Sequence, residues 1–152
     1  MIRRANLDGS NPQDLLTVTD TYPDAMALDV VNGKMYWSDG NVIRRASLNG
    51  SDPHDLLTAA SYLDAIALDV VNGKMYWSDG NVIRRASLDG SDPHDLLTAT
   101  SHLNAIALDV AGGKMYWRDG DAIRRANLDG SGRRDTIVTD AGFQGTIALG
   151  IR

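Results

Sequence analysis

A short aromatic motif that returns at a fixed interval limits the folds open to this chain more than any other feature. MYWSDG occupies residues 35–40 and 75–80, and MYWRDG occupies residues 115–120. About forty residues separate successive copies, and residues 34–60 match residues 74–100 except at Asn49 against Asp89 and Ala60 against Thr100. A constant period of this length indicates an architecture built from repeated structural units. Two further sequences keep the period: IRRASL or IRRANL at 2–7, 43–48, 83–88 and 123–128, and AMALD, AIALD or TIALG at 25–29, 65–69, 105–109 and 146–150.

Each period contains four short runs that are separated by turn residues. In the first full period the runs are Ala25–Val31, Lys34–Asp39, Val42–Leu48 and Asp55–Ala59. Asn32-Gly33 lies between the first two runs and predicts a type I′ hairpin turn, which needs positive φ at both central residues. Short strands joined by short loops form an up-and-down antiparallel sheet. No window has the 3.6-residue apolar period that is typical of a helix.

Both faces of the predicted sheet are apolar. Met35, Tyr36 and Trp37 are adjacent in one strand, so their side chains point alternately to the two faces. A sheet of this kind needs a similar neighbour on each side, and radial stacking of blades supplies it. Each buried aromatic side chain removes roughly 150–250 Å² from water. The sequence therefore predicts an all-β fold, a β-propeller of four-stranded antiparallel blades of about forty residues.

The blades are predicted to form a single domain over residues 1–152, with one blade split between the two ends of the sequence. The predicted units are a partial blade at 2–18, full blades at 24–60, 64–100 and 104–139, and an inner strand at 143–152. The split blade could close within the chain as an irregular four-bladed ring, or between chains as a homo-oligomeric ring of about eight blades. A third alternative is an open arc. Unpaired strand edges and an uncovered apolar face favour self-association.

The motif YW-x-D-G, followed by I-x-R-x-x-L-D-G-S and A-x-A-L-D, resembles the YWTD repeat, the class B repeat of low-density lipoprotein receptors, including its bacterial or designed tandem-repeat versions. The resemblance covers essentially the whole chain and implies a propeller framework. Two departures stand out: the usual Thr is replaced by Ser38, Ser78 and Arg118, and the repeats are too few for the six blades of the family. The framework residues that the resemblance implies are Tyr36, Trp37, Asp39, Tyr76, Trp77, Asp79, Tyr116, Trp117, Asp119, Arg4, Arg45, Arg85 and Arg125.

Arg-Arg pairs recur in the third strand of each repeat, at 3–4, 44–45, 84–85 and 124–125. Neighbouring residues of a strand point to opposite faces of the sheet. We therefore expect one arginine of each pair to bind a motif aspartate and the other to be solvated.

Composition excludes several classes of function. The 152 residues carry a net charge of −5, which argues against a nucleic-acid partner because phosphate binding needs a basic surface. The sequence has no cysteine, so thiol catalysis, disulfides and cysteine-bound metals are excluded. No apolar stretch is long enough to cross a membrane and no signal peptide is recognisable. We expect no cofactor and no membrane partner, and either a cytoplasmic protein or an excised or designed fragment.

A recognition surface is predicted on one face of the propeller, where the loops between blades carry aromatic and charged residues. Loops on a rigid scaffold are a common place for binding residues. The alternative is that these aromatic residues only fill the junctions between blades. The candidates are Tyr22, Tyr62, His102, Asp24, Asp64, Asn104, Ser38, Ser78, Arg118 and Asp121.

Three aspartates end the inner strands and are the only weak candidates for a metal site. Asp29, Asp69 and Asp109 could form a ring of oxygen ligands at one mouth of the channel. The alternative is that each carboxylate accepts hydrogen bonds from its own turn.

Three functions follow from these features. The first is a non-enzymatic propeller scaffold that binds protein, either another protein or further copies of itself. The second is a designed or recently amplified repeat scaffold without an evolved activity, which the near-identical repeats favour. The third is a metal-dependent propeller hydrolase that would use the aspartate ring. No Ser/His/Asp set, phosphate loop or pair of catalytic carboxylates stands out in the sequence.

Overall fold

The computed structural model of the protein describes residues 1–18, 24–139 and 147. Within them the chain forms one two-stranded and three four-stranded antiparallel sheets, which confirms the predicted all-β propeller architecture. No helix in the described part of the chain is long and apolar enough to span a bilayer. The partial blade consists of β1 (Ile2–Arg4) and β2 (Gln13–Leu16).

Each full blade has four strands that follow one another in space as in sequence. Blade one contains β3 (Met26–Asp29), β4 (Lys34–Asp39), β5 (Val42–Ser47) and β6 (His54–Thr58). Blade two contains β7 (Ile66–Asp69), β8 (Lys74–Asp79), β9 (Val82–Ser87) and β10 (His94–Thr98). Blade three contains β11 (Ile106–Asp109), β12 (Lys114–Asp119), β13 (Ala122–Asn127) and β14 (Asp135–Thr139).

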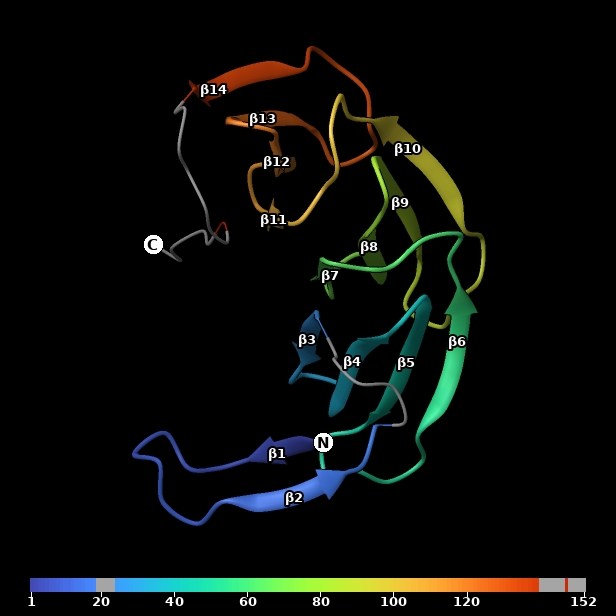
Figure 1. The fold of residues 1–152 in the computed structure, drawn as a ribbon, viewed down its shortest axis with the longest axis vertical. Coiled ribbons are helices and arrows are strands. Elements are labelled where there is room, and N and C mark those ends of the chain that lie inside the picture. Colours follow the sequence, from blue (N-terminus) through green and yellow to red (C-terminus); the bar gives the residue numbers. More distant parts are fainter. Residues whose placement is uncertain (19–23, 140–146, 148–152) are drawn as a thin grey trace.

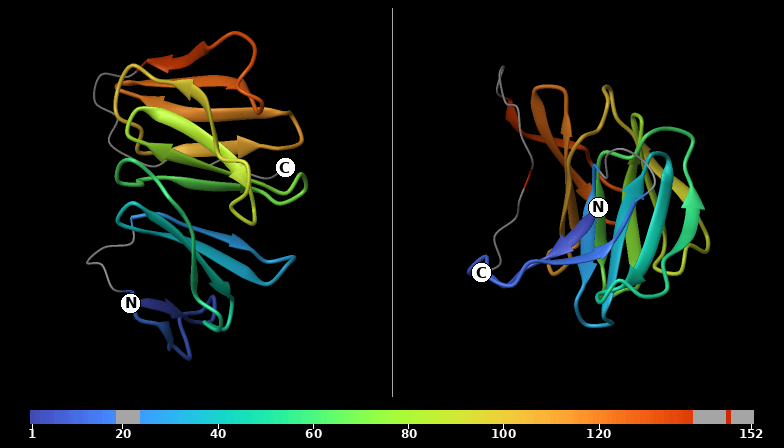
Figure 2. Two further views of the ribbon diagram at one scale, coloured as in Figure 1. Left: turned by 90° about the vertical axis from the view of Figure 1, so that its right-hand side faces the viewer. Right: turned by 60° about the horizontal axis from the view of Figure 1, so that its bottom comes forward.

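The blades are arranged as an arc around a common centre (Figure 1). The inner strands β3, β7 and β11 face that centre, and β7 contacts both β3 and β11. The partial blade and blade three lie at opposite ends of the arc, as the side view also shows (Figure 2). Among the described residues, neither β1 nor β2 contacts any strand of blade three. The predicted inner strand at 143–152 lies outside the described residues, apart from position 147.

Three apolar clusters hold the arc together, one at each junction between neighbouring blades. At the junction of blades one and two, Tyr36 and Ile43 of blade one pack with Met75 and Trp77 of blade two. Tyr76 points the other way and packs against blade three. The alternation of side chains along a strand thus lets one aromatic pair fill two junctions, and Trp37, Trp77 and Trp117 are each at most 1% exposed.

The first hairpin turn of each blade differs from the prediction. Gly33 has a φ of 66°, but Asn32 is not among the residues with positive φ, so the predicted type I′ turn is wrong. The Asp29 carboxylate accepts hydrogen bonds from both Asn32 N (2.9 Å) and Asn32 Nδ2 (2.8 Å). These bonds hold Asn32 within a four-residue loop and leave only the glycine in the left-handed region.

Blade junctions and the candidate binding face

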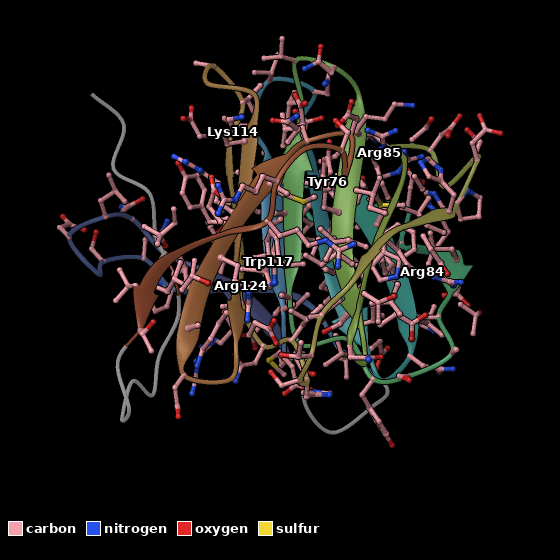
Figure 3. The ribbon with its side chains drawn as sticks, turned by 90° about the horizontal axis from the view of Figure 1, so that it is seen from above. Tyr76, Arg84, Arg85, Lys114, Trp117 and Arg124 are labelled. Carbon is pink, nitrogen blue, oxygen red and sulfur yellow. The ribbon has the colours of Figure 1, made fainter. Side chains whose placement is uncertain are left out.

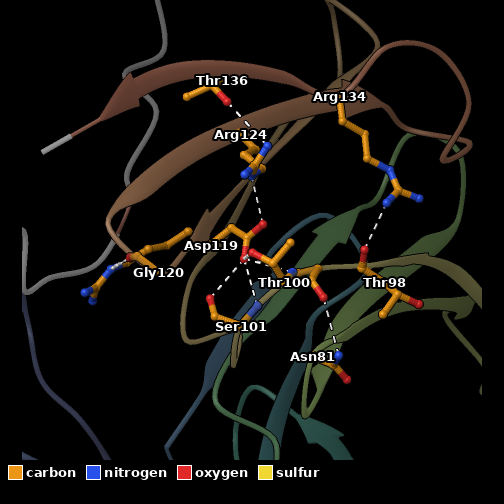
Figure 4. Close-up of polar contacts among 11 residues, drawn as sticks. Asn81, Thr98, Thr100, Ser101, Asp119, Gly120, Arg124, Arg134 and Thr136 are labelled. Atoms are coloured by element: carbon orange, nitrogen blue, oxygen red, sulfur yellow. Dashed lines mark hydrogen bonds and ion pairs between the residues drawn. The ribbon is translucent and has the colours of Figure 1, made fainter. Parts of the chain in front are cut away.

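The aspartate of the YW-x-D motif ties blades two and three to the loop that follows the preceding blade. Asp79 accepts hydrogen bonds from Ala60 N (3.1 Å) and Ser61 N (2.7 Å). Asp119 accepts hydrogen bonds from the main-chain and hydroxyl groups of Thr100 and Ser101, at 2.7–3.0 Å (Figure 4). Burial raises the pKa of Asp119, but the hydrogen bonds from Thr100 and Ser101 outweigh it and lower the pKa below its usual value.

In the three full blades the first arginine of the pair neutralises this buried carboxylate. In blade two, Arg84 bridges Asp79 on one side (3.3 Å) and Asp95 of the outer strand on the other (2.6 Å). Arg44 does the same with Asp39 and Asp55, and Arg124 contacts Asp119 at 2.8 Å. Figure 3 shows Arg84 and Arg124 on their strands. The predicted pairing of one arginine with the motif aspartate is therefore confirmed.

The second arginine is not solvated as predicted, because it binds the next blade. Arg85 and Tyr76 lie opposite each other in the register of β8 and β9 (Figure 3), and both donate to the carbonyl oxygen of Leu128 in blade three (3.2 and 3.1 Å). Arg45 and Tyr36 bind Leu88 O in the same way (3.0 and 3.2 Å). Arg4 lies at the arc's end and donates instead to Gln13 Oε1 (2.7 Å).

The LNGS turn at 48–51 and the LDGS turns at 88–91 and 128–131 also lie directly against the outer strand of the preceding blade. A Cβ on Gly90 would be 2.9 Å from the carbonyl oxygen of Leu56, and one on Gly130 would be 2.8 Å from that of Leu96. The same distance for Gly50 and Leu15 is 2.5 Å. Sequence reasoning missed this role, although a glycine in every copy of the turn is a signal that a main chain approaches closely.

Three of the predicted binding-face residues are buried, which differs from the surface position predicted for them. Ser38 and Ser78 are at most 1% exposed, and each hydroxyl accepts two main-chain N–H groups at the start of its own inner strand. Arg118 is 8% exposed and donates from Nε to Gly120 O. Ser38 and Ser78 lie in second strands that have a neighbouring blade on each face, so alternation does not bring them to the surface.

The other described candidates reach solvent. Tyr62 is 69% exposed and lines a shallow pocket of about 270 Å³ with Gly40, Asn41, Ala60 and Ser61. His102 Nε2 lies 2.5 Å from Asp64 Oδ2, so these two residues join blades three and two across their junction. Asp24, Asn104 and Asp121 are also exposed, and Tyr22 lies outside the described residues. Among the exposed candidates that the structure describes, His102 and Asp64 form a side-chain contact.

The aspartates at the ends of the inner strands are engaged by their own turns. Asp69 accepts from Asn72 N (3.0 Å) and Asn72 Nδ2 (2.8 Å), as Asp29 does with Asn32. Asp109 accepts from Gly112 N (2.8 Å). No group of three or more metal-ligating side chains is present in the described part of the chain. The geometry matches the alternative in which each carboxylate serves its own turn.

Comparisons with known proteins support the architecture. A chain in the crystal structure of the nidogen/laminin complex superposes with a TM-score of 0.78 at 26% identity, over 86% of this chain and 53% of that chain. The chain is a YWTD-like β-propeller. This propeller chain therefore spans about half the length of the nidogen/laminin chain that it matches.

Two further solved structures share the propeller fold. The computationally designed Ika4 protein matches with a TM-score of 0.61 at 12% identity, over 90% of this propeller chain and 86% of that protein. An auxiliary nutrient binding protein from Bacteroides thetaiotaomicron matches with a TM-score of 0.66 at 10% identity, over 77% of this chain and 30% of that one. No protein-family model and no curated protein matched the sequence.

Proposed function

We propose that this propeller is a non-enzymatic scaffold that binds protein, and that its first partner is another copy of itself. The observation that carries the proposal is the open arc: among the described residues, its two ends make no contact with each other. Both ends expose apolar side chains, with Leu7 fully exposed at one end and Ile137 and Val138 exposed at 44% and 45% at the other. Exposed apolar side chains at a sheet edge favour association.

Two further observations support a binding role over catalysis. The buried carboxylates of the framework, Asp79 and Asp119, are engaged by main-chain donors and arginines at the blade junctions, where they stabilise the fold. In the crystal structure that superposes on this chain with a TM-score of 0.78, nidogen is in a complex with another protein, laminin. Both observations are consistent with a propeller that binds another protein through an open surface.

The near-identity of blades one and two favours a second candidate, a designed or recently amplified scaffold with no evolved ligand. The similarity to the designed Ika4 fold is compatible with it. This candidate shares the propensity to self-assemble but predicts no further partner. The two candidates differ in whether the exposed group around Tyr62, Asp64 and His102 binds a ligand.

The experiment that tests the proposal is light scattering on a sizing column over a wide range of concentrations. We expect a stable multiple of the chain mass of 16.4 kDa, with the ring closed between chains. A particle of 16.4 kDa at every concentration would contradict self-assembly.

A further inference from the structure

The two junctions between full blades share one repeated contact, which defines what an uncovered blade face would accept. On one side stand a tyrosine of the second strand and an arginine of the third strand, as in Tyr76 and Arg85. On the other side stands an LDGS turn, whose leucine carbonyl receives both hydrogen bonds. The leucine side chain packs into the same junction, as Leu88 and Leu128 do, and the glycine lies against the outer strand.

Blade three carries the accepting half of this contact, and its side chains there are more exposed than those of blades one and two. Tyr36 and Tyr76 are 1% exposed and Ile43 and Ile83 are 0% exposed. Their counterparts in blade three, Tyr116 and Ile123, are partly exposed. Val138 is 45% exposed, whereas Leu97, which lies opposite Ile83 as Val138 lies opposite Ile123, is 4% exposed. We call Tyr116, Ile123, Arg125, Ile137 and Val138 the blade-three face. Among the described residues, neither Tyr116 nor Arg125 donates to a leucine carbonyl of a following blade.

The partial blade carries the inserting half of the contact, and no described residue covers it. Residues 7–10 read LDGS, and residues 3–10 repeat residues 124–131 without a difference. The structure leaves Leu7 fully exposed, whereas Leu48, Leu88 and Leu128 are each packed into a junction. A Cβ on Gly9 would meet no atom within 4 Å, in contrast to Gly50, Gly90 and Gly130. We call residues 7–10 the docking turn.

We propose that the docking turn of one chain inserts into the blade-three face of a second copy, and this proposal rests on the self-assembly proposed above. Leu7 would fill the apolar part of the face beside Ile123 and Ile137. Its carbonyl would accept hydrogen bonds from Tyr116 and Arg125, as Leu88 O does from Tyr36 and Arg45.

Charge complementarity supports the same placement. In the internal junctions the aspartate of the turn lies near the arginine of the preceding blade, so that Arg45 and Arg85 contribute to lowering the pKa of Asp89 and Asp129, after the larger effect of hydrogen bonds within each turn. Asp8 occupies the same place in the docking turn, and Arg125 occupies the same place on the blade-three face, where it pairs with Asp135 (3.2 Å). Asp8 would therefore share Arg125 with Asp135 in the new interface.

The position of the two halves favours a second copy over closure within one chain. They lie at opposite ends of the arc, and the described strands of the two ends do not contact each other (Figure 1). An interface between two different surfaces is heterologous, so it forms a closed ring when the rotation between copies permits it. A dimeric ring would contain this contact twice.

Two substitutions in the docking turn test the interface, each with a matched control. Gly9 has a φ of 81° in open space, and Asn tolerates this conformation, so Gly9→Asn adds bulk to the interface at little cost to the isolated chain. Gly33→Asn makes the same change at a φ of 66°, also in open space, but in an inner hairpin. Leu7→Ser removes the exposed leucine, and its control Val31→Ser removes another exposed apolar side chain.

The readout is the dissociation constant of the assembly, measured by sedimentation equilibrium on the full chain. We expect Gly9→Asn and Leu7→Ser to weaken the assembly at least about tenfold, which corresponds to about 1.4 kcal/mol, and both controls to leave it unchanged. An assembly that persists unchanged in both docking-turn variants would overturn this interface while leaving self-assembly intact. A wild-type chain that is monomeric throughout would overturn both proposals.

Discussion

At the residue scale, the molecule depends on a few positions at which the main chain of one blade touches the next. Gly90 is such a position, because it combines a φ of 88° with a carbonyl oxygen 2.9 Å from where its Cβ would be. The positive φ strains most side chains, and the close carbonyl oxygen leaves no room for a Cβ. Most glycines of the hairpin turns have the positive φ but no close neighbour, so the two effects can be separated experimentally.

We predict that Gly90→Ala destabilises the protein by about 2–4 kcal/mol, since backbone strain adds to a clash with Leu56 O. Gly73→Ala is the control: its φ is 66° and its Cβ would meet nothing within 4 Å, so only the strain of about 1 kcal/mol remains. The free energies of unfolding in urea provide the comparison. Equal losses for the two variants would show that the turn does not lie tightly against the outer strand.

The lowered pKa of Asp119 predicts that the stability of the protein depends on pH. Its folded-state pKa is lowered by the hydrogen bonds from Thr100 and Ser101, so it stabilises the fold above its unfolded pKa of about 3.9. That contribution is lost as the pH falls from about 5 through the folded-state pKa. We expect Asp119→Asn to be less stable than wild type at pH 7 and to lose less stability on acidification. Urea midpoints between pH 7 and pH 3 measure this, with exposed Asp121→Asn as a control that should follow wild type.

At the element scale, the second strand of each blade is the part that sequence alone describes least well. Lys34–Asp39 and its two repeats could be placed as strands with correct bounds, because turn residues follow each of them. Which side chains of this strand are exposed could not be predicted from the sequence. The sequence pattern predicts Ser78 on a binding surface, but a blade lies on either side of the strand and Ser78 is fully covered.

The contacts between blades were equally hidden from the sequence. Tyr76 and Leu128 are 52 positions apart, and Arg85 and Leu128 are 43 positions apart. A repeat period reveals the unit and its approximate length but not which groups of adjacent units meet. The hydrogen bond from Arg85 to a main-chain carbonyl was therefore missed, whereas the ion pair within one blade between Arg84 and Asp79 was foreseen.

Ser78→Ala tests the structural role that replaces the predicted binding role. The hydroxyl accepts hydrogen bonds from Asp64 N (3.1 Å) and Ala65 N (3.0 Å), and its removal leaves buried N–H groups without this acceptor. We expect a loss of about 1–3 kcal/mol in the free energy of unfolding. Exposed Ser61→Ala should change the stability by less than about 0.5 kcal/mol. An unchanged free energy of unfolding in Ser78→Ala would contradict this structural role of the hydroxyl.

At the scale of the whole molecule, the described blades form an arc that is held together by junctions of one kind. The same contact that joins blades one, two and three is presented in two unfilled halves at the ends of that arc. Asp29, Asp69 and Asp109 accept hydrogen bonds from their own turns, so these carboxylates need no bound ion to stabilise them.

We therefore predict that metal ions leave the stability unchanged. A ligand that binds only the folded state raises the melting temperature by mass action. Melting curves recorded in EDTA and then in excess Ca²⁺ should superimpose. A clear rise in the melting temperature with Ca²⁺ would revive the aspartate ring as a metal site.

The mass of a mixture of two variants is the most direct test of whether the ends of the arc join head to tail. Gly9→Asn weakens the docking turn, and Ile137→Asp places a charge on the blade-three face beside the expected position of Leu7. Each variant alone should remain near 16.4 kDa. An equimolar mixture should form a one-to-one complex, because each variant retains the half that the other has lost. If both variants assemble alone, or if the mixture stays monomeric at the highest soluble concentration, the ends of the arc do not join head to tail.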